Sequence, residues 1–276
     1  MMMARDRTPL DAPLIGAALI CVVALLAALA SLAGLFDNGL ALNIDARLSA
    51  PVAAHWFGTD ALGRDVLAMV GAGARISIGV ALGAVGAGLA VGVALGLAAA
   101  AIGGAVDELL SRFNDLVFAV PSLLLALLLA AALGPGPLDA VVALGIFNVP
   151  VFARVTRAGA GVLLTRDFVL AARLAGKGRL RIAVEHVLPN LSGTLIVQAT
   201  IQLALAIAAE AGLSYIGLGA QPPAASWGRM LSEAQTLAAI APWLVYSPGA
   251  ALCLTVLAFG VLGERLRARF DPRSRS

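Results

Sequence analysis

Charged residues, aromatic residues and cysteine are all scarce in this sequence. Only 13% of the 276 residues are charged, and only 5% are Phe, Trp or Tyr. A soluble domain carries about twice that share of charge, because polar side chains must cover its surface. The shortage therefore excludes a soluble globular protein, and the 61% hydrophobic content excludes a disordered chain.

Potential metal ligands are few and scattered. Cys21 and Cys253 both lie within apolar runs, and His55 and His186 are far apart in the sequence. This usage excludes a disulfide scaffold and a CxxC-type zinc cluster. It also excludes a histidine-rich metal centre. We therefore predict no metal site.

Motifs for nucleotide binding and hydrolysis are missing. The nearest approach to the phosphate-binding pattern GxxxxGK[ST] is Gly176-Lys177-Gly178, where Gly178 replaces the Ser or Thr that would hold magnesium. The sequence also lacks HExxH and GxSxG, the motifs of zinc peptidases and serine hydrolases. We predict a protein that is not an enzyme, has no catalytic residues and binds no cofactor itself.

Long uncharged runs are abundant. A transmembrane helix needs about 20 apolar residues to cross about 30 Å of hydrocarbon. The candidate runs are residues 12–36, 76–106, 116–138, 140–153, 186–209 and 234–263. None alternates apolar and polar residues as a barrel strand does, and backbone groups in lipid must pair within their own segment. These runs predict an all-α membrane protein with six transmembrane helices, the fourth being the shortest and extended by Arg154 and Arg157 reaching the headgroups.

The first run resembles a signal peptide in its basic flank, but it is longer than the roughly 7–15 residues of a signal core, so we expect a retained helix.

Six crossings place both termini on one side. Of the 19 Lys and Arg residues, those left on the opposite side are Arg47, Arg64, Arg75 and Arg229. The positive-inside rule then makes the terminal side cytoplasmic. The net charge of +3 reflects this orientation, and no nucleic-acid partner is expected.

Ionisable residues are absent from the middle of every run. A charge at mid-bilayer costs about 3 kcal/mol or more and normally serves a function. Glu210 comes nearest, and we expect it at the outer membrane interface. The pairs Asp60/Asp65 and Asp107/Glu108 are interpreted as solvated loop charges. The lack of a midplane carboxylate argues against a proton-coupled or sodium-coupled carrier.

Glycines in the second run recur at intervals of four residues, which places them on common helix faces. The two series are Gly79 with Gly83, and Gly88 with Gly92 and Gly96. Small residues let membrane helices approach closely, so we interpret this helix as tightly packed in the bundle. A surface that slides between transport states is the alternative.

The segment 160–190 carries a short helix on a basic loop. Thr165 and Asp167 are candidate caps for a helix that starts near Phe168 and stops at Gly176 or Gly178. A second short helix is expected over 179–187, before Pro189. The first helix presents small apolar residues, which suit docking into a groove of another protein. A helix lying at the membrane interface is the alternative.

This segment resembles the "EAA" coupling loop of ABC importer permeases. Its AARLAG (171–176) and EHVLPN (185–190) are similar to the AARALG and RHVLPN of the dipeptide, oligopeptide and nickel branch. Leu170 stands in place of the usual Glu, and His186 in place of the usual Ile. HWFGTDALGRD (55–65), GARIS (73–77), FAVPSL (118–123) and EAGLSYIGLGAQPPAASWGRML (210–231) also resemble motifs of this branch.

The resemblance implies a MetI-like importer permease, the second or C-type permease of its system, in the bacterial inner membrane. Implied partners are a homologous permease, two ATP-binding subunits that hold ATP and magnesium, an extracytoplasmic substrate-binding protein and the lipid bilayer. The implied ATPase-coupling residues are Ala171, Ala172, Arg173, Leu174, Gly176, His186, Leu188 and Pro189. The implied outward-loop residues are Gly58, Thr59, Asp60, Gly63, Arg64, Asp65, Gly217, Gly219, Pro222, Pro223, Trp227 and Gly228.

The expected layout has a cytoplasmic tail and first helix (1–36), an outward loop (37–75), a five-helix core (76–263) with a coupling loop at 157–188, and a cytoplasmic tail (264–276). The substrate implied is a di- or oligopeptide, with nickel or another small solute as the alternative. A stand-alone carrier or channel and an intramembrane enzyme are the competing classes. Transport by the chain alone would favour the carrier.

Overall fold

Helices make up nearly all of the computed structural model, which describes residues 12–270 apart from the side chains of Ala12, Ser122, Leu123 and Leu133. The outer parts of the two predicted tails, 1–11 and 271–276, lie outside the described residues. The longer helices are α1 (Ala12–Leu32), α2 (Val66–Ile102), α3 (Gly104–Ala119), α4 (Ser122–Leu133), α5 (Pro137–Leu163), α8 (Leu188–Tyr215) and α10 (Trp243–Phe270). The short ones are α6 (Asp167–Leu174), α7 (Arg179–Ile182) and α9 (Trp227–Ala234).

Five of these helical segments are long and apolar enough to cross a membrane. A sixth crossing arises if α3 and α4 form one broken span, since they bend by 88° across the break at Pro121. The third uncharged run therefore does not form one straight helix. Proline removes a backbone donor and clashes with the preceding turn, which explains the break there.

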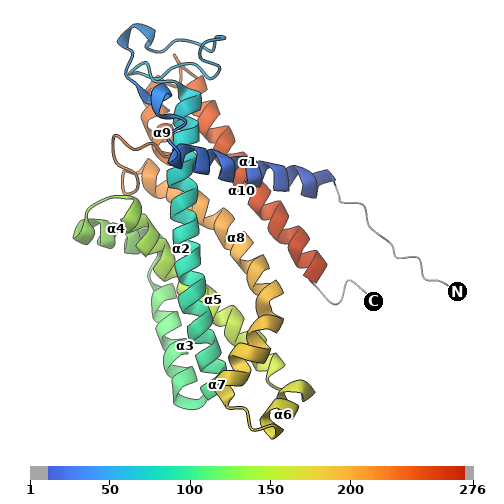
Figure 1. Cartoon of the computed structure of the whole chain (residues 1–276). Helices are drawn as coiled ribbons and strands as arrows, with labels where there is room; N and C mark the ends of the chain where they lie inside the picture. Colours follow the sequence, from blue (N-terminus) through green and yellow to red (C-terminus); the bar gives the residue numbers. More distant parts are fainter. Residues whose placement is uncertain (1–11, 271–276) are drawn as a thin grey trace, which may run out of the picture.

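Helix α2 is the axis of the bundle (Figure 1). Its 37 residues span about 55 Å at 1.5 Å per residue, well beyond the thickness of the hydrocarbon. It begins at Val66, whereas the sequence suggested Ile76, because Asp65 caps its N-terminus and Arg75 is accommodated on its exposed side. The loop before it accordingly ends at residue 65.

Helices α2 and α5 form the closest packing in the molecule, through one of the two glycine series. Gly88, Gly92 and Gly96 are buried against α5. A Cβ atom at Gly92 would lie 2.5 Å from the carbonyl oxygen of Val149. By contrast, Gly79 and Gly86 have no atom near the position of a Cβ. In the first series Gly83 does face α5, but a Cβ there would lie 3.3 Å from the Val141 side chain, a looser contact. The Gly88 series is therefore the tighter of the two packing surfaces.

Helix α5 is longer than its uncharged run, because two arginines are paired within the protein. Arg154 lies 3.4 Å from Asp115, and Arg157 donates to Asp107 at 2.6 Å; both carboxylates belong to α3. Arg154 also lies over the ring of Phe118, 4.8 Å from its centroid. These arginines link α3 to α5, and Asp107 is an ion-pair partner rather than a free loop charge.

The remaining long helices complete the bundle around α2. Helix α8 packs against α2, α5 and α10, and α1 lies across α2 and α10 (Figure 1). A buried amide pair joins α5 to α8, since Gln202 donates to the side-chain oxygen of Asn148 at 2.9 Å. Such interhelical hydrogen bonds add about 0.6 kcal/mol in membrane bundles.

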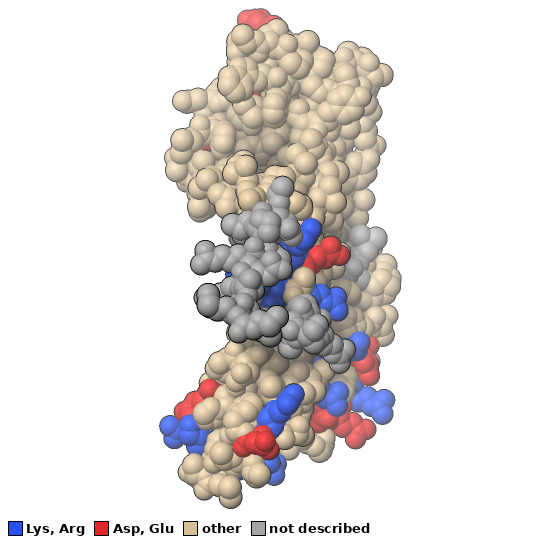
Figure 2. Space-filling view, turned by 90° about the vertical axis from the view of Figure 1, so that its right-hand side faces the viewer, with Lys and Arg blue, Asp and Glu red and all other residues tan. Residues whose placement is uncertain are grey.

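The bundle has two different ends. Residues 37–65 and 216–242, which include α9, lie together at the loop end, while α6 and α7 lie at the opposite α6 end (Figure 1). On the face shown in Figure 2, Lys and Arg gather in the half that carries the α6 end, and the loop end is almost free of them. This separation agrees with the charge asymmetry of the sequence.

Candidate functional site

Helix α6 is a short helix with a glycine-closed C-terminus. Gly176 has φ +81°, its N–H donates to the carbonyl of Arg173 at 2.9 Å, and the N–H of Lys177 donates to Ala172 at 3.1 Å. This is the double hydrogen bond that ends many helices, and only glycine adopts that conformation without strain. The helix therefore stops abruptly, and the chain turns back toward the membrane.

The start of α6 differs from the expected capping. Arg166 occupies the cap position and makes no side-chain cap, while the hydroxyl of Thr165 donates backwards to Val162 at 2.9 Å. The turn after α5 is so short that Thr165 serves the end of α5. Asp167 is the first residue of α6, where its charge favours the positive end of the helix dipole.

One face of α6 anchors it, and the other is exposed. Val169 and Ala172 are buried against the bundle. On the other face Leu170 is 58% exposed and Leu174 is 83% exposed. Phe168 lies nearer the buried face, at the side of Ala172. Apolar side chains so exposed at a helix tip are unfavourable in water and suit burial against a partner.

A polar cluster ties α6 to the following helix. The ammonium of Lys177 lies 2.7 Å from Glu185 and 2.9 Å from the Nε2 atom of His186. Glu185 also pairs with Arg181 at 2.6 Å. Helix α7 does not stop before Pro189: it continues through a π-helical turn, Ala183–Val187, into α8, giving a helical segment Arg179–Tyr215 that reaches the loop end.

The predicted coupling residues therefore divide into separate groups. Ala171, Arg173, Leu174 and Gly176 are exposed, and Ala172 is buried as the anchor. His186 is half-buried beside Lys177, whereas Leu188 and Pro189 form the first turn of α8. The exposed surface also includes Phe168 and Leu170, which the motif did not single out.

The first loop motif, 55–65, is a structured turn that leads into α2. Both side-chain oxygens of Asp60 are used: Oδ1 accepts from the N–H groups of Leu62 and Arg64 at 2.8 Å, and Oδ2 pairs with the Arg64 guanidinium at 2.7 Å. Asp65 accepts from the N–H of Ala68 at 3.0 Å and from His55 Nδ1 at 2.8 Å. The interpretation of these aspartates as solvated charges is thus wrong.

Other residues of this motif fix the backbone. Thr59 is fully buried, and its hydroxyl donates to the carbonyl of Ala46. The indole N–H of Trp243 donates to the carbonyl of Thr59 at 3.1 Å. Gly58 and Gly63 have positive φ, and a Cβ at either would collide with the backbone of Ser49 or Asn43. The motif thereby holds the loop against the start of α2 and of α10.

The second loop motif, 210–231, joins α2, α8 and α9, and we call this contact region the loop-end clasp. The indole of Trp227 in α9 donates to the carbonyl of Val70 at 2.9 Å, and its backbone N–H donates to Ser77 at 3.2 Å. A Cβ at Gly228 would collide with the backbone of Ala211 in α8, and one at Gly219 with Ser214. These contacts explain why the GARIS segment in α2 accompanies this motif.

Glu210 lies at the centre of this clasp. It is 1% exposed, and the hydroxyl of Ser214 donates to its Oε1 atom at 2.6 Å. Glu210 thus lies in the part of α8 nearer the loop end, and the protein encloses its side chain. Its position at the outer membrane interface stays a prediction.

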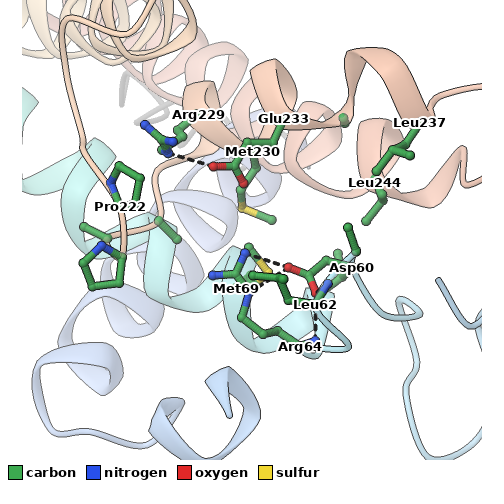
Figure 3. A pocket seen from close by; sticks show the side chains of 16 residues that line it. Asp60, Leu62, Arg64, Met69, Pro222, Arg229, Met230, Glu233, Leu237 and Leu244 are labelled. Carbon is green, nitrogen blue, oxygen red and sulfur yellow. Dashed lines mark hydrogen bonds and ion pairs between the residues drawn. The ribbon is translucent and has the colours of Figure 1, made fainter. Parts of the chain in front are cut away.

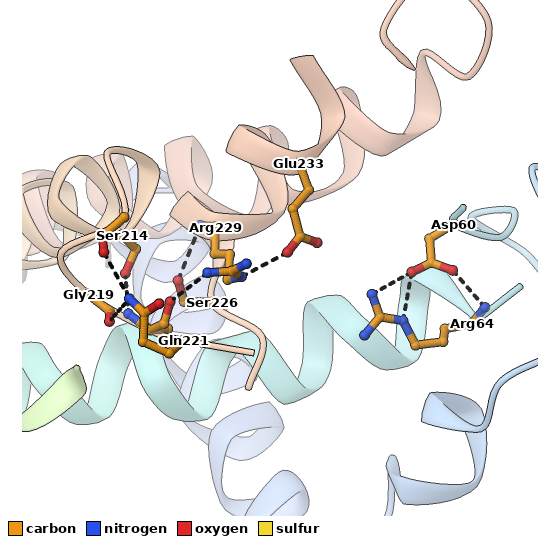
Figure 4. A network of polar contacts seen from close by, with 10 residues as sticks. Asp60, Arg64, Ser214, Gly219, Gln221, Ser226, Arg229 and Glu233 are labelled. Carbon is orange, nitrogen blue, oxygen red and sulfur yellow. Dashed lines mark hydrogen bonds and ion pairs between the residues drawn. The ribbon is translucent and has the colours of Figure 1, made fainter. Parts of the chain in front are cut away.

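A cavity of about 380 Å³ separates the two loop motifs (Figure 3). Its apolar floor includes Met69, Met230 and Leu244. Two ion pairs flank it, Asp60 with Arg64 and Arg229 with Glu233, the latter at 2.8 Å (Figure 4). Arg229 also donates to the carbonyl of Ala220 at 3.2 Å, which holds the Pro222–Pro223 segment beside the cavity.

Of the predicted outward residues, Asp60, Arg64, Pro222 and Pro223 line this cavity. Gly217 has φ +87° and turns the chain after α8. Sequence reasoning missed Met69, Glu233, Leu237 and Leu244, which also line it. The spacing of four between Arg229 and Glu233 in a short helix was the one available signal for part of this set.

The fold and its two ends define a multi-pass, all-helical integral membrane protein. Residues 92–276 match the family model of the inner membrane component of binding-protein-dependent transport systems. The chain belongs to this family, and it is therefore an inner-membrane transport permease.

Relatives support the assignment over most of the chain. The dipeptide transport system permease protein DppC of Alkalihalophilus pseudofirmus is 40% identical over 85% of this chain and 77% of its own length. The glutathione transport system permease protein GsiD of Shigella flexneri is 43% identical over 81% of this chain and 74% of its own length. GsiD of Escherichia coli is 41% identical over the same shares.

A solved structure confirms the fold. The inward-facing MetNI methionine ABC transporter contains a chain that superposes with a TM-score of 0.59 at 17% sequence identity. The match covers 75% of this chain and 98% of that one. The expected MetI-like bundle is thus confirmed as a fold.

Proposed function

We propose that this chain is one permease subunit of an ATP-driven importer of short peptides. The observation that carries the proposal is the exposed apolar face of α6 on a rigidly anchored helix. The named relatives, which serve dipeptide and glutathione transport systems, support the peptide class of substrate. Both termini and α6 then lie on the cytoplasmic side, where Lys and Arg gather.

The proposed assembly contains a homologous permease, two ATP-binding subunits and an extracytoplasmic substrate-binding protein. ATP and magnesium belong to the ATP-binding subunits, because this chain has no phosphate-binding motif. Leu170 and Leu174, which share the exposed face of α6, would fill a groove in one of those subunits.

Motion at α6 has a direct route to the loop end. Val169 and Ala172 fix α6 to the bundle, and Lys177 ties it to Glu185 and His186 at the start of the next helix. The helical segment Arg179–Tyr215 then runs to Glu210 and Ser214 in the loop-end clasp. A push on α6 would therefore tilt this segment and shift α9, a rigid-body route to alternating access.

The cavity between the loop motifs is a proposed contact for the substrate-binding protein. It lies at the end opposite α6, and it combines an apolar floor with flanking charges of both signs. That combination is typical of a pocket that receives one anchoring side chain of a partner.

The decisive experiment replaces Leu174 by Asp and measures co-purification of the ATP-binding subunits encoded with this chain. A charge in an apolar groove should weaken association by about tenfold or more, since burying an unpaired charge costs several kcal/mol. Leu42→Asp is the matched control, because Leu42 is 66% exposed at the loop end. Equal recovery of ATPase with both variants would contradict the proposed role of α6.

A further inference from the structure

A second cavity, of about 400 Å³, lies at the α6 end. It is formed where the ends of α2 and α5 meet α6 and α7, just outside two membrane-spanning helices. Its lining residues are Ala100, Ala101, Ile102, Gly161, Leu164, Thr165, Arg173, Arg179 and Ile182. The exposed face of α6, which carries Leu170 and Leu174, does not contribute to it.

The charge of this cavity is of one sign. Arg173 and Arg179 both line it, and no Asp or Glu is among its lining residues. The acidic residues nearest to these arginines along the chain are Asp167 and Glu185, and Glu185 is already engaged by Lys177 and Arg181. The guanidinium of Arg179 donates a long hydrogen bond of 3.5 Å to the carbonyl of Ile102. Two arginines that line one hollow without an acidic residue create a positive potential that favours an anion there.

The remaining lining residues are mostly apolar in type. They come largely from the last turns of α2 and α5 and include Ile102, which is 47% exposed, and Leu164. A basic hollow bounded by the ends of transmembrane helices has the features of a site for a lipid headgroup, with the acyl chains continuing along the helices. A carboxylate from a partner protein would need no apolar wall on the membrane side.

We propose that Arg173 and Arg179 bind the phosphate of an anionic phospholipid from the cytoplasmic leaflet. Guanidinium groups hold phosphate oxygens through paired, charge-assisted hydrogen bonds. The bound headgroup bridges α6 to the end of α2 and thereby braces the coupling helix against the bundle.

The test is native mass spectrometry of the full-length chain, purified in mild detergent doped with phosphatidylglycerol. We expect one tightly retained phosphatidylglycerol on the wild type and a loss of about tenfold or more with Arg173→Gln/Arg179→Gln, since each juxtamembrane cation contributes about 1 kcal/mol. The Arg173→Lys/Arg179→Lys variant should keep most of the retention, because lysine still supplies the charge. Retention that is equal in the wild type and the Gln variant would overturn the proposal.

Matched arms separate the sources of phosphate and guard against misfolding. Arg166→Gln removes one exposed charge from the same loop without touching the cavity, and it should leave retention unchanged. Phosphatidylcholine in place of phosphatidylglycerol should be retained poorly. A bound inorganic phosphate without lipid, or an equal loss with Arg166→Gln, would contradict the lipid site. Circular dichroism of each variant checks that its helices are intact.

Discussion

The glycines of α2 show how one residue type serves two surfaces of the same helix. At Gly92 a side chain would collide with the backbone of α5, whereas at Gly86 it would enter open space. Close helix approach of this kind replaces the hydrophobic effect as the source of stability in lipid, because lipid tails are as apolar as leucine. The two positions, six residues apart, therefore differ in their tolerance of a side chain.

We predict that Gly92→Val lowers the thermal stability of the purified chain sharply, while Gly86→Val leaves it nearly unchanged. A Cβ at Gly92 would lie 2.5 Å from the carbonyl oxygen of Val149 and 2.7 Å from Phe152. Overpacking of this kind costs about 1–3 kcal/mol. The measurement is the melting temperature of each variant in the same detergent. Equal melting temperatures for the two variants would show that α2 and α5 do not pack in this way.

The acidic residues at the loop end show that a sequence pattern can identify a motif without revealing the surroundings of its side chains. The sequence pattern identified Asp60, Asp65 and Glu210 as members of motifs, but it placed them in solvent or at an interface. Their partners explain the difference: Asp60 and Asp65 satisfy backbone donors of a turn, and Glu210 is buried and accepts a hydrogen bond from Ser214. Those partners come from loop geometry and from contacts between distant segments, which no local pattern encodes.

At the scale of elements, the C-terminal end of α6 is fixed by one of the two glycines that follow the helix. Its C-terminal turn depends on the positive φ of Gly176. Gly178, two residues later, has φ −72° and ψ 157°, a conformation that any residue adopts. The chain therefore offers a matched pair for testing whether the rigid end of α6 matters.

We predict that Gly176→Val uncouples ATP hydrolysis from uptake in the assembled transporter, while Gly178→Val does not. Valine is strongly disfavoured at positive φ, by about 1–2 kcal/mol or more, so the end of α6 would unwind. Membrane insertion should be normal in both, because neither glycine lies in a helix. Uptake per ATP hydrolysed in proteoliposomes is the measurement; an unchanged ratio for Gly176→Val would refute a requirement for the closed turn.

Helix existence was more predictable than helix length. Uncharged runs located each apolar helix, since hydrophobicity alone drives insertion. They misplaced the start of α2 by ten residues, because Arg75 is carried on a helix that extends beyond the hydrocarbon. They also could not show that Pro121 breaks a helix while Pro150 lies within α5 and Pro189 in the first turn of α8. Neighbouring helices decide how each proline is accommodated.

At the scale of the whole molecule, the chain connects the α6 tip, the proposed contact for an ATP-binding subunit, to the loop end. Helix α6 and the segment Arg179–Tyr215 lie in series, and the clasp around Glu210 lies at the far end of that segment. No group of metal ligands occurs among residues 12–270. We propose that the chain forms part of the translocation pathway, and that ATP-binding subunits supply the energy for moving its helices.

The most direct test reconstitutes the chain into proteoliposomes alone, with its proposed partners, and with partners whose ATP-binding subunits cannot hydrolyse ATP. Uptake of a labelled dipeptide, presented with the binding protein, is measured in each. The account predicts uptake only in the complete assembly with active ATPases and none from the chain alone. Peptide uptake or ATP hydrolysis by the chain without partners would contradict it.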